Sequence, residues 1–321
     1  MKAALLPDRG VVKVAGDGAQ NFLHGLVTAD ILKLRPGTAV FAALLTPQGK
    51  IIADFIVAQA PSAQSSAGDS TGGSSSGCAG DGGFFLDIPR ALGKALVERL
   101  NLYKLRAKVL IEDLSATLSV LAAWDGKPGE SWDGTGTTTS CLCYADPRLP
   151  ALGLRAIIPA DSAGEAVAAL GAALVDAGDY EAHRIALGIP RGGVDFAYSD
   201  AFPHETDMDQ LGGVDFQKGC FIGQEVVSRM QHRGTARTRA VPVRYKGTAP
   251  DVGTAITAGG RQIGTLGSTS GGHGIALLRL DRVDEALADG DTLTAGAVSI
   301  ELVKPDWARF PFPGEQEKAA E

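Results

Sequence analysis

Residues 212–234 of this 321-residue chain read GGVDFQKGCFIGQEVVSRMQHRG. Glycines at the start of this stretch and beside its cysteine permit backbone conformations that other residues avoid. From Phe221 onward, apolar residues recur at helical spacing, which predicts a helix that begins near Phe221 or Gly223. The sequence therefore predicts that Cys220 lies at or just before a helix N-terminus, two residues after Lys218.

Cys220 is the residue of this stretch that is best suited to chemistry. Unpaired N–H groups at a helix start and the nearby ammonium of Lys218 both favour negative charge, which would lower the pKa of the thiol. The same geometry also binds a carboxylate or phosphate without catalysis. The alternative is a tight turn that buries a small residue, because free cysteine is among the most buried residue types.

The segment KGCFIGQEVVSR, residues 218–229, resembles the signature of the YgfZ family of folate-binding proteins. These proteins are relatives of the T-protein of the glycine cleavage system, and they include mitochondrial iron–sulfur cluster assembly factors. Shorter runs at 25–30, 45–50, 103–109 and 181–190 also resemble the family. The resemblance covers most of the chain in patches and is sharp over residues 218–229.

The patterns of the chain and the resemblance together predict an α+β protein with a GcvT/YgfZ-like, multi-subdomain fold. Two βαβ-like units with antiparallel partners indicate ferredoxin-like subdomains. Short Val/Ile/Thr-rich runs between glycine turns after residue 240 indicate a small antiparallel β-barrel. We expect a GcvT-like folate-binding region over 1–235 with flexible insertions at about 60–83 and 125–140, a barrel over 236–310, and a flexible tail over 311–321.

The resemblance implies that tetrahydrofolate, or a derivative of it, occupies a channel faced by residues 218–229. Cys220 is then the candidate catalytic residue, and no metal ligand is predicted. The candidates for folate contact are Lys218, Gly219, Gly223, Gln224, Glu225, Arg229 and Asp54. Alternatively, Glu225 and Arg229 only stabilise a helix as an i,i+4 pair.

Asp54 lies within the apolar run IIADFIVA, residues 51–58, where a carboxylate is costly to bury without partners. The T-protein carries an acidic pair on the corresponding strand, near its folate. The alternative is an outward-facing residue on an alternating strand.

Three functions compete. The resemblance implies a folate-binding accessory factor, without turnover, for the assembly, insertion or repair of [4Fe–4S] clusters in client proteins. The first alternative is a tetrahydrofolate-dependent aminomethyltransferase of the T-protein type. Against it, the T-protein usually has a glutamate two residues after the arginine that Arg184 matches, and Ala186 stands there. The third function, a tRNA-modification accessory protein, would use the basic residues between Arg229 and Lys246. A net charge of −7 and the lack of an RNA-binding module argue against it.

The basic stretch 229–246 contains no acidic residue, which suits an anion site for a polyglutamate tail, a phosphate or an acidic partner, or else a solvated linker.

The rest of the composition is less distinctive. No apolar run approaches the ~20 residues of a membrane span, and the N-terminus lacks a long apolar region. Four cysteines without a C-x-x-C pair argue against a zinc site or a disulfide framework. We therefore expect a cytoplasmic protein that binds folate and iron–sulfur client proteins or their assembly machinery, with no membrane partner and no nucleic acid.

Overall fold

The computed structural model describes residues 1–62, 81–126, 141–234 and 236–314. The chain divides into two units. Unit 1 comprises Met1–Pro47, Ile52–Tyr180 and Gly212–Gln224, and unit 2 comprises Gln48–Ile51, Glu181–Leu211 and Glu225–Glu321. Large parts of the expected insertions and of the expected tail lie outside the described residues, and the domain limits at 235 and 310 stay a prediction.

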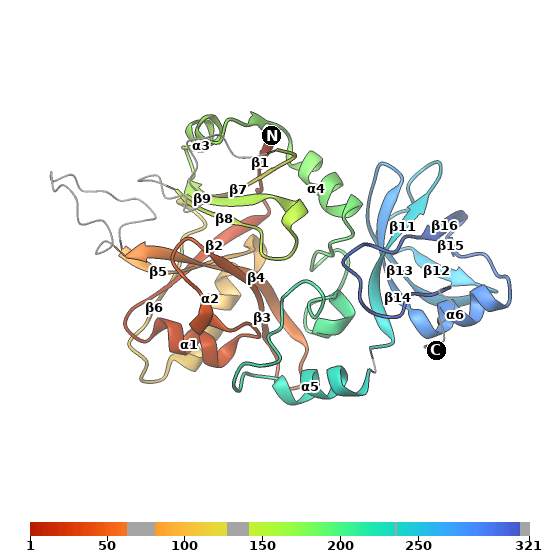
Figure 1. Ribbon diagram of the computed structural model, residues 1–321, viewed down its shortest axis with the longest axis horizontal. Coiled ribbons are helices and arrows are strands. Elements are labelled where there is room, and N and C mark those ends of the chain that lie inside the picture. The colour runs from red at the N-terminus through yellow and green to blue at the C-terminus, as the bar shows by residue number, and fades with distance from the viewer. Residues whose placement is uncertain (63–80, 127–140, 235, 315–321) are drawn as a thin grey trace, which may run out of the picture. The chain divides into compact units, whose positions relative to one another are not determined.

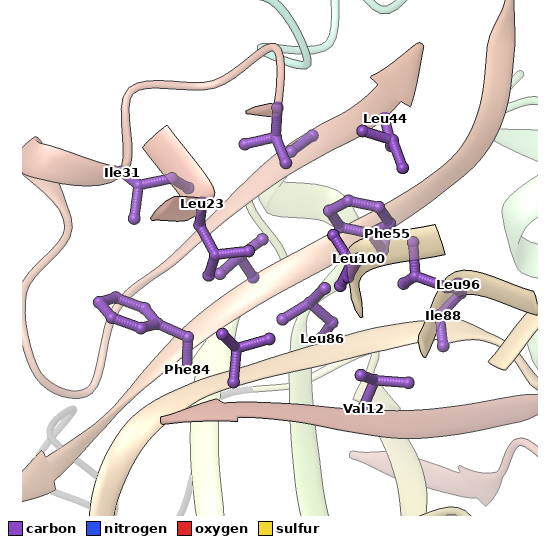
Figure 2. Close-up of a cluster of buried hydrophobic side chains, with 14 of the residues drawn as sticks. Val12, Leu23, Ile31, Leu44, Phe55, Phe84, Leu86, Ile88, Leu96 and Leu100 are labelled. Carbon is purple, nitrogen blue, oxygen red and sulfur yellow. The ribbon is translucent and has the colours of Figure 1, made fainter. Parts of the chain in front are cut away.

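Unit 1 contains a five-stranded sheet of order β3-β4-β5-β2-β6. Its strands are β2 (Arg9–Ala15), β3 (Ala39–Leu45), β4 (Ile51–Ser62), β5 (Asp81–Pro89) and β6 (Leu110–Asp113). Both β4 and β5 continue a few residues into the Ser/Gly-rich tract that was expected to be a loop. Helices α1 (Ala19–Leu26) and α2 (Gly93–Lys104) contribute Leu23, Leu96 and Leu100 to a buried cluster with Phe55 and Leu86 of the sheet (Figure 2).

A second sheet of unit 1 has the order β10-β1-β7-β9-β8. Its strands are β1 (Lys2–Leu5), β7 (Leu118–Trp124), β8 (Leu142–Ala145), β9 (Leu154–Pro159) and β10 (Ala173–Leu174), and α3 (Ala163–Ala169) follows β9. The pair β1 and β10 is parallel, and the other pairs are antiparallel. The Ala-rich run over 163–177 predicts one longer helix, but α3 ends at Ala169 and β10 follows it.

A buried ion network joins the two sheets of unit 1. Asp87 on β5 is fully buried and pairs with Arg9 on β2 (2.6 Å) and with Arg155 on β9 (2.5 Å). Arg155 also pairs with Asp146, just after β8 (2.9 Å). Burial alone would raise the pKa of both carboxyl groups, but the guanidinium groups outweigh it and lower each pKa. Each charge of the network thus depends on a partner from another strand.

Unit 2 contains a closed barrel of order β11-β14-β13-β12-β15-β16 (Figure 1). Its elements are β11 (Thr238–Tyr245), β12 (Ala255–Ala258), β13 (Arg261–Ser270), β14 (His273–Arg279), α6 (Leu280–Ala288), β15 (Thr294–Ala295) and β16 (Val298–Leu302). All of its strand pairs are antiparallel. The predicted α+β class with a small antiparallel barrel is therefore confirmed. No helix of the described residues is long and apolar enough to cross a membrane.

Two further helices precede the barrel in the sequence: α4 (Ala177–Ala186) and α5 (Gln224–Arg233). Arg184 of α4 is buried and pairs with Asp195 (3.0 Å), while its Nη2 donates to the hydroxyl of Ser268 on β13 (2.7 Å). The Asp195 carboxylate in turn accepts from the N–H of Ser268 (2.7 Å). These contacts fix the segment Glu181–Leu211 to the barrel within unit 2.

Candidate functional site

The segment Gly212–Gln224 belongs to unit 1 and is anchored to the turn that follows α1. Thr28 is fully buried, and its hydroxyl donates to the carbonyl of Gly213 (2.5 Å) and accepts from the N–H of Ala43 (2.8 Å). The N–H of Asp215 donates to the carbonyl of Thr28 (3.0 Å). The start of the signature segment is therefore held at a fixed position by backbone groups of the sheet and of the turn.

Lys218 is the strongest anchor of the segment. Only 7% of the residue is exposed, and its Nζ atom donates three hydrogen bonds to backbone carbonyl oxygens. The acceptors are those of His24 (2.6 Å), Val27 (2.5 Å) and Ala29 (3.0 Å). The last carbonyls of a helix lack partners within the helix, and the negative end of its dipole favours a cation. Lys218 thus caps the C-terminal end of α1 at His24 and Val27, and its third donor binds Ala29 in the turn that follows.

This position changes the role that the sequence suggested for Lys218. Burial lowers its pKa to about 8, while the charges of Asp30 and Asp215 act in the opposite direction. Because its three donors are used by carbonyls, the ammonium group has no donor left for a hydrogen bond to a Cys220 thiolate. It serves instead to hold the loop that carries the thiol.

A partly exposed charge cluster supports the same loop. Asp215 accepts from the N–H groups of Gln217 (2.8 Å) and Lys218 (3.1 Å), and its other oxygen pairs with Lys33 (2.8 Å). Lys33 also pairs with Asp30 (3.1 Å). Burial raises the pKa of Asp215, but the hydrogen bond from Lys33 and the two backbone donors outweigh it, so this pKa is lowered. This cluster was not predicted from the sequence, although Asp30 belongs to the run at 25–30 that resembles the family.

Cys220 is exposed, whereas Cys141 and Cys143 are buried. Burial raises the pKa of Cys143 to about 12, which keeps that thiol protonated. The helix α5 begins at Gln224, one residue after the later of the two predicted starts. Residues 221–223 thus separate Cys220 from the helix, and the effect of a helix dipole falls off within one turn. Cys220 is the accessible thiol of the described residues, on a loop fixed by Lys218.

The other predicted contacts do not form one cluster. Gly223 has a φ of +80°, a conformation that favours glycine, where the chain turns into α5. A Cβ atom at Gly219 would meet nothing within 4 Å, so that glycine faces open space. Glu225 and Arg229 pair with each other on the surface (2.7 Å) and belong to unit 2, whereas residues up to Gln224, which is half-buried, belong to unit 1.

Asp54 is buried, with 8% of the residue exposed. It lies on β4 between Ala53 and Phe55, which belong to the hydrophobic core, so strand alternation directs it to the other face of the sheet. The outward-facing alternative is therefore wrong, because this sheet buries residues on both faces.

The basic stretch 229–246 does not form a single surface. Arg239 is buried and pairs with Asp207 (3.0 Å) and Asp209 (2.8 Å). Arg244 and Lys246 line a pocket of about 560 Å³ on the barrel. The stretch therefore combines a structural cation with surface cations. Among the described residues, no group of three or more His, Cys, Asp or Glu side chains is placed to hold a metal ion.

The fold is that of the glycine cleavage T-protein. The solved aminomethyltransferase T of the glycine cleavage system from Bartonella henselae superposes with a TM-score of 0.67 over 97% of this chain and 87% of its own. The sequences are 13% identical, so this likeness shows the fold alone. Residues 237–310, which include the barrel, match the family described as "CAF17, C-terminal beta-barrel domain".

Relatives of similar sequence are more specific. The chain is 32% identical over 322 residues to the iron–sulfur cluster assembly factor IBA57 of Mus musculus, covering 94% of this chain and 84% of the relative. The human IBA57 protein is 30% identical with the same coverage. A homolog from Mycosarcoma maydis is 34% identical over 258 residues, and the match spans 59% of its length. This chain belongs to the IBA57 family of iron–sulfur cluster assembly factors.

These relatives refine one prediction and overturn another. The resemblance to the YgfZ proteins indicated the right kind of protein, and IBA57 is the particular family. All three relatives are named as mitochondrial, which contradicts the predicted cytoplasmic location. The prediction rested on sparse cysteines and on the composition of the N-terminus. Sparse cysteines indicate only that a protein does not depend on disulfides, and they do not distinguish one reducing compartment from another.

Proposed function

We propose that this protein is an accessory factor for iron–sulfur cluster assembly in which Cys220 is the functional thiol. The observation that carries the proposal is an exposed cysteine on a loop that is fixed by a buried lysine. Thiolate is the form of cysteine that binds iron, and binding releases its proton. A rigid loop lowers the entropic cost of presenting that thiol to a partner.

A single thiol limits how this protein could bind a cluster. An iron–sulfur cluster is usually held by four cysteine thiolates. Cys220 would supply one ligand to a cluster in transit, while a partner protein supplies the others. The cluster is then cargo rather than a resident cofactor, and the clients would be [4Fe–4S] proteins.

Tetrahydrofolate binding is the finer part of the proposal. Asp54 is suited to it, since a buried carboxylate can accept hydrogen bonds from the N–H groups of a pterin ring. Lys218 is not suited to a folate carboxylate, because its three donors are already used. A calorimetric titration of the protein with 5-formyltetrahydrofolate, which measures the affinity for folate, tests this part. We expect Asp54→Asn to weaken binding and Glu112→Gln, at an exposed carboxylate on β6, to leave it unchanged. Equal binding by the wild type and both variants would remove Asp54 from the folate site.

Rescue of cells that lack this protein tests the main proposal. An aconitase-type [4Fe–4S] enzyme and the glycine-dependent formation of methylene-tetrahydrofolate are assayed with wild-type, Cys220→Ser and Gln217→Ala proteins. Gln217 is the matched control, because its side chain is exposed on the same loop. We expect Cys220→Ser alone to fail to restore aconitase activity. Loss of glycine cleavage with normal aconitase would instead favour the transferase reaction.

A further inference from the structure

The two most exposed large hydrophobic residues of the described chain lie three residues apart. Leu105 is 90% exposed and Leu102 is 73% exposed. Single exposed leucines are common on protein surfaces, but neighbouring ones mark a contact surface more often. Both lie at the C-terminal end of α2, which ends at Lys104. This end of the helix, residues 99–108, is called the α2 tip below.

The geometry of α2 keeps both leucines out of the core. Leu96 and Leu100 of the same helix are buried, and Leu102 is turned about 200° from Leu100 at ~100° per residue. Leu105 follows the helix with a φ of 43° and a ψ of −106°. A left-handed φ is uncommon for a residue with a side chain, and such strain tends to occur at functional sites. A glycine would relieve the strain, so the leucine side chain itself is the feature to explain.

The α2 tip is also strongly basic. It contains Arg99, Lys104, Arg106 and Lys108, and no acidic residue occurs between positions 99 and 111. Among the described residues, none of these four cations forms an ion pair. In a chain of net charge −7, this places an unneutralised positive cluster around two exposed leucines. Apolar anchors within a charged rim are typical of protein interfaces.

The α2 tip and the Cys220 loop adjoin opposite ends of α1. A Cβ atom at Gly18, just before α1, would lie 3.7 Å from Val109 and 3.9 Å from the N atom of Lys108. At the other end, Lys218 caps the last carbonyls of the helix. Since α1 has eight residues, the two features are separated by roughly 12 Å of helix at 1.5 Å per residue. A single partner domain is large enough to contact both.

We propose that the α2 tip is a docking surface for an acidic protein partner, in which an apolar recess takes Leu105 and Leu102. The inference rests on the proposed function, in that this partner is the protein that exchanges a cluster at Cys220. A protein recess fits the observations better than a membrane does. A helix that binds at a membrane surface buries a whole apolar face, and the apolar face of α2 is already packed in the core of unit 1.

Photocrosslinking in cells identifies the partner. The photoreactive amino acid p-benzoylphenylalanine replaces Leu105 in the full chain, or Leu174 as a control. Leu174 is 57% exposed on β10, in the second sheet of unit 1, whereas α2 packs on the first sheet. We expect a discrete adduct at position 105 and none at 174. The partner is then purified, and its affinity for the full-length protein is measured at several salt concentrations.

Charge and shape are tested separately with that purified partner. We expect Leu105→Asp and the double variant Arg106→Glu with Lys108→Glu each to weaken binding about tenfold or more, with a smaller salt dependence for the double variant. Leu174→Asp should bind as the wild type does. Replacing an acidic residue of the partner's interface with lysine should restore binding of the double variant, and circular dichroism confirms that each variant is folded.

Several results would overturn the docking surface. One is an equal yield of adducts at positions 105 and 174, and another is unchanged affinity of Leu105→Asp for the partner. A third is binding of the protein to phosphatidylserine vesicles, in the absence of a protein partner, that Leu105→Asp abolishes. Rescue separates this proposal from the wider one. If Leu105→Asp restores aconitase activity fully and Cys220→Ser does not, only the docking surface fails. If both variants restore it, the proposed function fails as well.

Discussion

Lys218 of unit 1 and Arg239 of unit 2 are both buried cations, but they are compensated in different ways. Lys218 donates to three neutral carbonyls, whereas the guanidinium group of Arg239 pairs with two carboxylates. Arg239 binds Asp209 through two parallel bonds of 2.8 and 2.9 Å, a geometry that suits a planar fork. A lysine is a point donor, which suits carbonyls that converge on one atom.

The comparison shows that removing the two cations should reduce stability by different amounts. Without Lys218, unit 1 would keep three uncharged carbonyls that lack a donor. Without Arg239, unit 2 would keep the fully buried carboxyl group of Asp207, whose pKa burial already raises well above its ordinary value, and the nearly buried carboxylate of Asp209. An uncompensated buried charge costs more than an unpaired dipole. The two cations therefore predict effects of different size.

The largest effect is expected for Arg239→Met. Removing one partner of a buried ion pair typically costs about 3–5 kcal/mol, because the remaining charge is stranded. Hydrogen-exchange mass spectrometry measures the opening free energy of each unit separately. We expect peptides from residues 237–310 to lose protection while those from residues 1–47 keep theirs. A loss below about 1 kcal/mol would mean that water reaches Asp207 and Asp209.

Lys218→Met should destabilise unit 1 by about 2–3 kcal/mol, the typical range for charge-assisted hydrogen bonds and buried unpaired carbonyls. In the rescue assay we expect this variant to fail as Cys220→Ser does, although its thiol is intact. Lys218→Arg should not restore function, because a planar fork cannot place three donors on converging carbonyls. Full rescue by a correctly folded Lys218→Met protein would show that the cap is not needed to present Cys220.

The sequence predicted the barrel and the loop with the accessible thiol better than it predicted the roles of Lys218 and Arg239. Strand-length runs between glycine turns indicated the barrel, and the KGC signature marked the loop with the accessible thiol. The partners of Lys218, however, lie 189 to 194 residues earlier in the chain, and no local spacing reveals them. The outward-facing alternative for Asp54 fails for a related reason. Alternation predicts an exposed face only when one side of a sheet meets solvent, and this sheet is covered on both.

Alkaline pH separates the two cations further. The pKa of Lys218 is about 8 in the folded protein, below its ordinary value of 10.5, whereas the hydrogen bonds and charges of Asp209 and Asp207 raise the pKa of Arg239 against the effect of burial. Between pH 8 and pH 10.5, the unfolded chain holds a proton on Lys218 that the folded chain has lost. The free energy of unfolding therefore rises with pH over this range.

The expected gain is about 2 kcal/mol between pH 7 and pH 9.5, for the wild type relative to Lys218→Met. Urea unfolding of both proteins at several pH values measures it. An Arg239→Lys protein provides the contrast, since it introduces a lysine beside carboxylates that favour its charged form. A difference between wild type and Lys218→Met that stays flat with pH would mean that the carbonyls hold the ammonium charged throughout.

The smallest effect is expected at Glu225 and Arg229, the one pair of signature residues that is exposed on both sides. Their side chains are 85% and 55% exposed, and an exposed i,i+4 pair contributes about 0.3–0.5 kcal/mol. Glu225→Gln should therefore change the free energy of unfolding by no more than that. The difference between the variant and the wild type should shrink further at high salt, because salt screens exposed charges. If the same substitution nevertheless abolishes rescue of aconitase activity, Glu225 contacts a ligand or a partner. The signature would then have two functional positions, the thiol on the rigid loop and a carboxylate on the helix, with Lys218 as the structural residue that precedes both.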